Sequence, residues 1–305
     1  MDLRTRIISR DFPPFRYLRD KPNAALQIKQ IEEWIDDETA LAFYGSELQN
    51  AELAARHFHD ARDEAGFEKV CKAIESFEET EHGSRYIAIR KAQANARAWE
   101  SARKSGVSAR HEGREFSNYE TPTPVQKKAK DCVEAMAGNL KSSAMIVLYG
   151  PPGTGKTHLG VASMITRIRL SSGASSMGAD GKYHKAAIMC TPVDISRRVR
   201  ATYDDEAAET ESKVIEDFAT CGLLVVDEIG AGSGSDHEKQ MLCDVLCKRY
   251  ENRLPSLMIS NLGTEDIRKA LGERVIDRIY EDAGSAFVPM AWPSYRPEAR
   301  RQATV

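Results

Sequence analysis

The chain lacks a long apolar run, an excess of charge of one sign, and a dense set of cysteines. No apolar run approaches the ~18 residues that a membrane-spanning helix needs, and residues 1–6 lack the apolar core of a secretory signal peptide. The 43 Lys and Arg against 46 Asp and Glu leave a net charge of −3, which excludes binding of DNA through overall charge. We therefore expect a cytoplasmic protein that has no membrane partner.

The six cysteines are scattered through a chain of 305 residues, which is typical of reduced thiols. Cys243 and Cys247 are four residues apart and would share one face of a helix. A zinc site would need two more ligands at suitable spacing, and none is evident. With 41% hydrophobic residues, the chain can bury a substantial core, and its length predicts two domains.

Proline is absent and glycine is rare between residues 24 and 104, where apolar residues recur at near-helical spacing. This pattern predicts an all-helical domain at 1–104, with three to five amphipathic helices broken near Gly45, Gly66 and Gly83. The domain is either a solvated helical bundle or a module that binds a partner. Glycines and prolines then predict a linker at 105–124.

In residues 125–305 short apolar runs alternate with helical patterns, which predicts an α/β domain. A helix is expected at 125–139, and Ser171–Gly181 is expected to be a surface loop. Five short apolar runs suit strands that are buried on both faces, as in a parallel sheet covered by helices. These runs are 144–149, 186–190, 223–226, 256–260 and 286–290.

The first of these runs leads directly into the motif Gly150-Pro-Pro-Gly-Thr-Gly-Lys-Thr157, and a helical pattern follows. The motif matches G-x-x-x-x-G-K-[ST] in the strand-to-helix context that a phosphate-binding loop requires. Its glycines let the backbone N–H groups point inward, and the helix N-terminus adds partial positive charge. Lys156 can reach the β and γ phosphates of ATP, and the Thr157 hydroxyl can ligate Mg²⁺. The predicted nucleotide-binding residues are Gly150, Pro151, Pro152, Gly153, Thr154, Gly155, Lys156, Thr157 and His158.

A second candidate site is acidic. It follows another apolar run, Leu223-Leu-Val-Val226, which is predicted to be a buried strand and is followed by Asp227 and Glu228. Asp227 would hold Mg²⁺ at the carboxyl end of the strand. Glu228 would orient and deprotonate the attacking water, which favours an ATPase over a small-molecule kinase. Asn261, at the end of the next strand, would hold the lytic water or the γ phosphate. Its alternative role is that of a turn-forming residue.

The combination of motifs resembles the AAA+ ATPases and, within them, the DnaC-type bacterial helicase loaders. The resemblance covers about residues 105–300, and the IstB transposition helpers are similar in the same core. The motifs that carry it are Phe116-Ser-Asn-Tyr119, the phosphate-binding loop with Leu159, Leu223-Leu-Val-Val-Asp-Glu-Ile-Gly230, Ser260-Asn261, Leu271-Gly-Glu-Arg-Val-Ile-Asp-Arg278 and Trp292-Pro-Ser-Tyr-Arg296.

The resemblance implies roles for three arginines. Arg278 matches the arginine finger that enters a neighbouring subunit's site, and Arg274 is a second candidate for that contact. Arg296 matches the sensor II position. Alternatively, Arg274 and Arg278 belong only to a charged helix face. Because 15 residues follow the last strand-like run, we expect no separate lid domain.

A candidate surface for binding single-stranded DNA contains three arginines and one aromatic residue. Cations of this kind bind the phosphates of the strand, and an aromatic ring can stack on a base. These residues are Arg197, Arg198, Arg200 and Tyr203. The alternative is a solvated basic helix face. Residues 1–115 carry 19 Lys and Arg against 21 Asp and Glu, a net −2, and residues 116–305 carry 24 against 25, a net −1. Any affinity for DNA must therefore come from a local cluster.

By analogy with the family, the chain is expected to be an ATP-dependent loader of the replicative helicase in a bacterial cell, encoded by the bacterium, a phage or a plasmid. Residues 1–104 would bind a hexameric helicase of the DnaB type, although they match no motif of the family. ATP sites at subunit interfaces would drive self-association around single-stranded DNA, and hydrolysis would drive release. The alternatives are an IstB-like DNA transposition helper and a small-molecule kinase.

Overall fold

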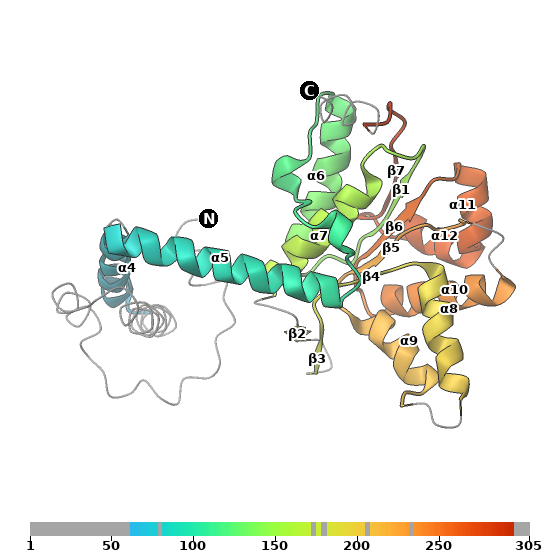
Figure 1. The fold of residues 1–305 in the computed structure, drawn as a ribbon, viewed down its shortest axis with the longest axis horizontal. Coiled ribbons are helices and arrows are strands. Elements are labelled where there is room, and N and C mark those ends of the chain that lie inside the picture. The colour runs from blue at the N-terminus through green and yellow to red at the C-terminus, as the bar shows by residue number, and fades with distance from the viewer. Residues whose placement is uncertain are drawn as a thin grey trace. The chain divides into compact units, whose positions relative to one another are not determined.

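The computed structural model describes residues 62–78, 81–171, 175–177, 182–204, 208–231 and 235–295 (Figure 1). The chain divides into two compact units, residues 1–94 and residues 95–305. The helices predicted between residues 24 and 61, together with the expected break at Gly45, lie outside the described residues. The predicted division at residues 104 and 124 stays a prediction.

The described part of the first unit is helical. Helix α4 spans Glu64–Glu78, and helix α5 spans Glu81–Lys104, so α5 begins in the first unit and ends in the second. Asp63 caps α4, because its Oδ1 accepts the N–H of Gly66 at 3.0 Å. Gly66 and Gly83 therefore lie within the first turns of α4 and α5, and the helix boundaries fall just before them.

The second unit is built on a parallel sheet of five strands in the order β4-β5-β6-β1-β7. The strands are β1 (Met145–Tyr149), β4 (Ile188–Cys190), β5 (Leu224–Val226), β6 (Ser256–Ser260) and β7 (Ala286–Pro289). β1 pairs with β6 on one side and with β7 on the other. Each predicted apolar run contains one of these strands, so the predicted α/β sheet is confirmed.

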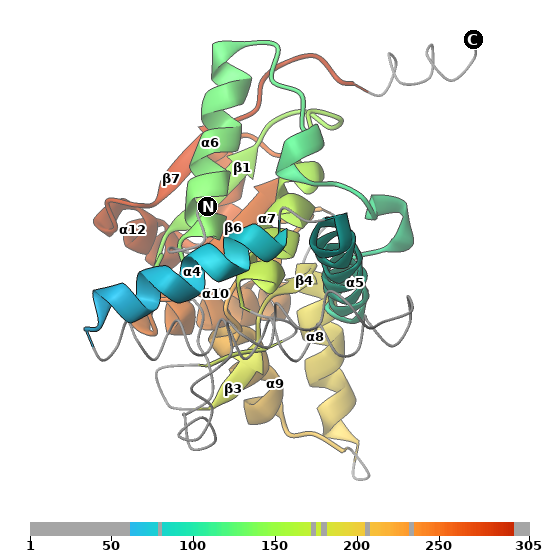
Figure 2. The same ribbon diagram turned by 90° about the vertical axis from the view of Figure 1, so that its left-hand side faces the viewer.

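Helices cover both faces of the sheet (Figure 1 and, turned by 90°, Figure 2). On β1, Ile146 and Leu148 join one buried core, whereas Met145 and Val147 join the other. The two-sided burial explains why the strands are continuous apolar runs. The first core includes α6 (Pro124–Gly138), α7 (Lys156–Leu170) and the end of α5; the second includes α8 (Pro192–Arg200), α9 (Glu211–Thr220), α10 (Asp236–Glu251), α11 (Thr264–Leu271) and α12 (Glu273–Glu281).

A short antiparallel hairpin, β2 (Ser175–Met177) and β3 (Tyr183–Lys185), occupies part of the segment predicted to be a surface loop. The hairpin is tied to the larger sheet unit, because the N–H of Gly222 donates to the carbonyl of Lys185 at 2.9 Å. The loop prediction is therefore wrong for residues 175–177. A strand this short, beginning with two serines, carries no apolar alternation that would reveal it.

Residues 105–123, which we call the strap, pack on the core that contains α6 and α7. Val107, Phe116 and Tyr119 are buried in that core. Gly106 has a φ of 109°, and a Cβ there would lie 1.9 Å from the Met189 carbonyl oxygen. Only glycine fits this contact. The segment predicted to be a linker is thus held against strand β4.

Arg249 of α10 is fully buried and has no carboxylate partner among the described residues. Its guanidinium donates to the carbonyls of Phe218 and Cys221 at 2.8 Å each and to that of Pro255 at 2.5 Å. A further bond reaches Ser256 Oγ at 2.9 Å. Burial lowers the pKa of Arg249. The planar fork of donors thereby joins the end of α9 to the start of β6.

Replacing Arg249 by Met is expected to lower the free energy of unfolding by about 3–5 kcal/mol, because several buried oxygens lose their donor. Chemical denaturation followed by circular dichroism measures the loss. The matched control is Lys248→Met at the exposed neighbouring position of α10, which should change stability by less than about 0.5 kcal/mol. Equal denaturation midpoints for the two variants would show that the bonds of Arg249 contribute little.

The cysteines are free thiols. The Sγ atoms of Cys243 and Cys247 lie 3.9 Å apart on α10, which confirms that the two share a helix face. Nowhere in the described ranges are three His, Cys, Asp or Glu side chains grouped to hold a metal ion. Among the helices that the structure describes, none is both long and apolar enough to cross a membrane.

Candidate nucleotide-binding site

The loop from Gly150 to Gly155 connects β1 to the N-terminus of α7. Gly150, Gly153 and Gly155 have φ values of 133°, 86° and 94°, in the region that favours glycine. At Gly150 a Cβ would also lie 2.7 Å from the carbonyl oxygen of Met290. The loop is therefore held in a tight turn that leads into the positive end of a helix dipole, which is the geometry of an anion cradle.

The ammonium group of Lys156 is held by the loop itself. Lys156 is 5% exposed, and its Nζ donates to the carbonyls of Gly150 and Pro151 at 2.7 Å each. A longer bond of 3.3 Å reaches Thr154 Oγ1. A buried cation among backbone groups at the start of a helix is suited to the terminal phosphates of a nucleotide.

Thr157 and Asp227 meet at the predicted metal position. The Thr157 hydroxyl donates to Asp227 Oδ2 at 2.8 Å, although the two residues are 70 positions apart. The N–H of Asp227 donates to the Cys190 carbonyl at 2.9 Å, which fixes the turn after β5. One hydroxyl and one carboxylate are hard oxygen ligands of the kind that Mg²⁺ prefers, so the residues fit that ion.

Glu228 adopts an uncommon backbone conformation beside Asp227. Its φ is 61°, and its N–H donates to Asp227 Oδ1 at 2.7 Å. A left-handed conformation costs a non-glycine residue about 1–2 kcal/mol, and such strain concentrates at functional sites. The Glu228 side chain is exposed and has no hydrogen bond or ion pair within the described part of the chain. The turn thus presents a free carboxylate at the end of β5.

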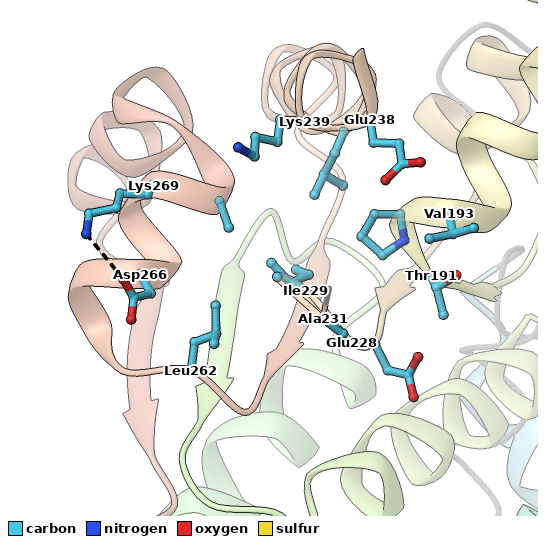
Figure 3. Close-up of a pocket in the computed structure, with 14 residues that line it drawn as sticks. Thr191, Val193, Glu228, Ile229, Ala231, Glu238, Lys239, Leu262, Asp266 and Lys269 are labelled. Carbon is cyan, nitrogen blue, oxygen red and sulfur yellow. Dashed lines mark hydrogen bonds and ion pairs between the residues drawn. The ribbon is translucent and has the colours of Figure 1, made fainter. Parts of the chain in front are cut away.

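A cavity of about 240 Å³ lies next to Glu228. Its walls come from the starts of α8 and α10, the turn after β5 and helix α11, and they include Val193, Leu242 and Leu262. Figure 3 shows Glu228 at the edge of this cavity, with its carboxylate directed away from Lys239 and Lys269. The carboxylate is therefore separate from the cations of the cavity rim.

Asn261 follows β6, which lies between β5 and β1 in the sheet. The preceding Ser260 fixes the end of the strand, because its Oγ donates to the Ile229 carbonyl at 2.7 Å and accepts the Leu262 N–H at 3.1 Å. The sheet order therefore brings Asn261 between the acidic turn and the phosphate-binding loop. Its side chain is exposed, and its role towards the lytic water stays a prediction.

The ring of His158 faces the strap. Its Nε2 lies 3.0 Å from both the Glu115 carbonyl and Asn118 Oδ1, and its ring packs edge-on against Tyr119 at 5.1 Å between centroids. Burial lowers the pKa of His158. The imidazole thus holds the strap to α7, and the place of His158 among the nucleotide-binding residues stays a prediction.

Arg278 and Arg274 lie four residues apart on α12. The Arg278 guanidinium donates to Glu281 Oε2 at 3.0 Å and lies 4.8 Å from the centre of the Tyr250 ring. Arg274 is exposed and makes no hydrogen bond or ion pair within the described residues. Neither residue contacts the chain's own phosphate-binding loop, and their finger roles stay predictions. Arg296 lies outside the described residues.

The four predicted DNA contacts do not form one free cationic cluster. Arg198 donates to both carboxylate oxygens of Glu209, at 3.0 and 2.6 Å, and also to Asp217 at 2.6 Å. Arg200 Nη2 lies 3.2 Å from Glu238 Oε1. Arg197 donates to Asp194 of its own helix at 3.3 Å, so each of the three arginines has a carboxylate partner. Arg197, Arg200 and Tyr203 are exposed, and their contact with DNA stays a prediction.

Two aromatic residues at the loop were not assigned a role from the sequence. Tyr119 Oη donates to the Thr154 carbonyl at 3.3 Å, and Trp292 Nε1 donates to the same oxygen at 2.9 Å. Both residues belong to motifs that carry the family resemblance. This membership is the sequence feature from which a role for them could have been inferred. Their target atom depends on contacts across 35 and 138 positions, which spacing alone does not reveal.

The sheet order, the phosphate-binding loop after β1 and the Asp–Glu pair after β5 define a P-loop nucleoside triphosphatase core of the AAA+ type. The sequence model of the family described as "IstB-like ATP binding protein" matches residues 91–303. The chain therefore belongs to this family.

Curated relatives include the replicative helicase loader DnaC of Escherichia coli K12, which is 32% identical over 197 residues, covering 63% of this chain and 73% of that protein. The loader DnaC of Buchnera aphidicola subsp. Acyrthosiphon pisum is 28% identical over 194 residues, with coverages of 63% and 73%. A solved structure of the DnaC helicase loader covers 60% of this chain and 99% of its own, at 20% identity and a TM-score of 0.46. The predicted relationship to the DnaC-type loaders is confirmed by the sequence matches.

Proposed function

We propose that this protein is an ATP-dependent loader that places a replicative DNA helicase on single-stranded DNA. The observation that carries the proposal is the match to the E. coli helicase loader over 197 residues, at 32% identity. The nucleotide site supports it independently, since the parts needed for binding and cleaving ATP lie together. The description of the family as ATP-binding supports ATP as the nucleotide.

In the proposed reaction, ATP and water give ADP and phosphate. The amides of the phosphate-binding loop and the Lys156 ammonium bind the β and γ phosphates and neutralise charge that develops on them. Mg²⁺, held by Thr157 and Asp227, would polarise the phosphate oxygens. Glu228 accepts a proton from the attacking water, and Asn261 orients that water. Arg278 of a neighbouring copy would complete the site.

The helicase would be bound by residues 1–104, which lie mostly ahead of the family match that begins at residue 91. Self-association through the ATP sites would place several copies along one DNA strand, where Arg197, Arg200 and Tyr203 are exposed. Because each copy offers little free positive charge, we expect weak, salt-sensitive affinity per subunit.

A second candidate is an ATP-dependent DNA transposition helper, which the family's description as IstB-like favours. The two functions differ in their partners and in their DNA. A loader would bind a hexameric helicase and prefer single strands, whereas a transposition helper would bind a transposase and prefer duplex DNA. The ATP site alone does not distinguish them.

The test mixes the full chain with the host's hexameric helicase and circular single-stranded DNA coated with single-strand-binding protein. We expect ATP and the full chain together to increase the helicase retained on the circles after gel filtration. Lys156→Ala is the control, because it removes the cation that binds the phosphates and should abolish the increase. If the helicase neither binds the protein nor reaches the DNA, while duplex DNA and a transposase are bound, the transposition alternative replaces the loader.

A further inference from the structure

The carbonyl oxygen of Thr154 accepts hydrogen bonds from two side chains that lie far apart along the chain. Tyr119 belongs to the strap that precedes α6, and Trp292 belongs to the segment that follows β7. Their donors, Oη and Nε1, lie 3.3 and 2.9 Å from the same oxygen. Thr154 is fully buried, so this oxygen is shielded from water and depends on these donors.

The direction of this carbonyl fixes the direction of the next amide. A trans peptide unit is planar, and its C=O and N–H point to opposite sides. Donors that hold the Thr154 oxygen outward therefore turn the N–H of Gly155 inward, towards the concave side of the loop. In phosphate-binding loops the inward amides form the anion cradle. The two aromatic side chains thus orient the Gly155 N–H towards the phosphate site, and they act on it through the Thr154 carbonyl.

The neighbouring peptide unit is fixed in the same way. The backbone N–H of Tyr295 donates to the Gly153 carbonyl at 3.1 Å. Tyr295 is itself held at its hydroxyl by Gln126 Nε2, at 2.7 Å. Gln126 is 4% exposed and belongs to the capping box that starts α6 with Thr123. By the same geometric rule, the N–H of Thr154 is turned inward.

Close packing locks Tyr119 against the loop. A Cβ on Gly155 would lie 2.8 Å from the Tyr119 ring, so this position accepts only glycine while the ring is in place. The ring also packs edge-on against the His158 ring of α7. Burial raises the pKa of Tyr119 further above neutral pH than that of an ordinary tyrosine, so the hydroxyl is a donor at neutral pH.

We propose that Tyr119 and Trp292 are positioning residues that preset the phosphate-binding loop for the diphosphate part of the nucleotide. They act through the Thr154 carbonyl, and Tyr295 supports them through Gly153. The inference rests on the nucleotide site within the proposed function, and it is independent of helicase loading.

The test removes the donor atoms and keeps the rings. Tyr119→Phe loses only the hydroxyl, and Trp292 is replaced by benzothienylalanine, which has sulfur in place of the indole N–H. Displacement of a fluorescent ADP analogue then measures the affinities of unlabelled ADP and of inorganic pyrophosphate. Each single change should weaken both ligands by the same factor, about 3-fold. The double variant should weaken both by about 20-fold, because the buried carbonyl then has no donor left.

Steady-state kinetics supply a second readout. The KM for ATP should rise by the same factor as the ADP dissociation constant, while kcat stays close to that of the wild type, because the lost interaction belongs to binding in general. Tyr183→Phe, on the exposed ring of the hairpin, is the matched control. Without nucleotide the double variant should melt at a somewhat lower temperature than the wild type, because the buried Thr154 carbonyl loses its donors, and ADP should raise its melting temperature by less.

Two results would overturn the inference. One is wild-type affinity for both ligands in the double variant. The other is a loss of ADP affinity with unchanged pyrophosphate affinity, which would show that the rings contact the nucleoside instead. A wild-type chain that binds neither ATP nor ADP would contradict the proposed nucleotide site itself, and a failure to load helicase with normal nucleotide binding would leave the inference intact.

Discussion

Glu228→Gln is expected to bind ATP with near wild-type affinity and to hydrolyse it about 100- to 10,000-fold more slowly. Glutamine has the shape of glutamate but takes no proton from the attacking water. Because the Glu228 backbone N–H donates to Asp227, the turn beside the metal position keeps its geometry in the variant. Phosphate release measures turnover, and equilibrium binding of a fluorescent ATP analogue measures affinity.

In the proposed assembly ATP lies at the subunit interfaces and its hydrolysis drives release, so the variant should also accumulate the assembled state. Sedimentation velocity with ATP is expected to show larger species for Glu228→Gln than for the wild type. The matched control is Glu238→Gln, which changes a carboxylate on the wall of the neighbouring cavity. Glu238 faces Arg200 instead of the acidic turn, so turnover should stay near the wild-type rate. Normal hydrolysis by Glu228→Gln would remove this residue from the catalytic role.

The parts of the site that the sequence could predict are those fixed by short-range chemistry. Glycines at 150, 153 and 155 are required by positive φ angles, and the motif shows that requirement directly. The strands were predictable because both faces are buried, so their sequences are apolar without interruption. The pairing of Thr157 with Asp227 followed from sheet topology, since parallel strands present their carboxyl ends at one edge.

What could not be predicted depends on partners that are distant in the sequence. The ion pair of Arg198 could not be predicted, because its partner Asp217 lies on α9, 19 positions away in the sequence. The contact of the His158 ring with the Glu115 carbonyl of the strap spans 43 positions. In both cases the partner comes from another segment of the chain, which spacing along the sequence does not reveal. The hydrogen bonds of Tyr119 and Trp292 to Thr154 were missed for the same reason.

Arg278→Ala is expected to keep ATP affinity and to lower turnover by about 1,000-fold or more, the size of effect that an arginine finger has on phosphoryl transfer. Arg278 contacts Glu281 and Tyr250 instead of its own phosphate-binding loop, so its loss leaves that loop intact. Arg268→Ala is the matched control. Arg268 lies on the neighbouring helix α11 and stacks similarly on Tyr280, 5.6 Å from the ring centre. Its loss should leave turnover close to that of the wild type.

Mixing two inactive variants tests whether Arg278 acts on a neighbouring copy. An Arg278→Ala subunit keeps Glu228, and a Glu228→Gln subunit keeps the finger. In a mixed assembly, a finger from the second can enter the ATP site of the first, and that site then has every catalytic group. Turnover of the mixture should therefore exceed the sum of the two variants, and it should peak at intermediate mixing ratios. If Arg278 acts only within its own chain, no ratio restores activity, because each chain lacks one of the two groups.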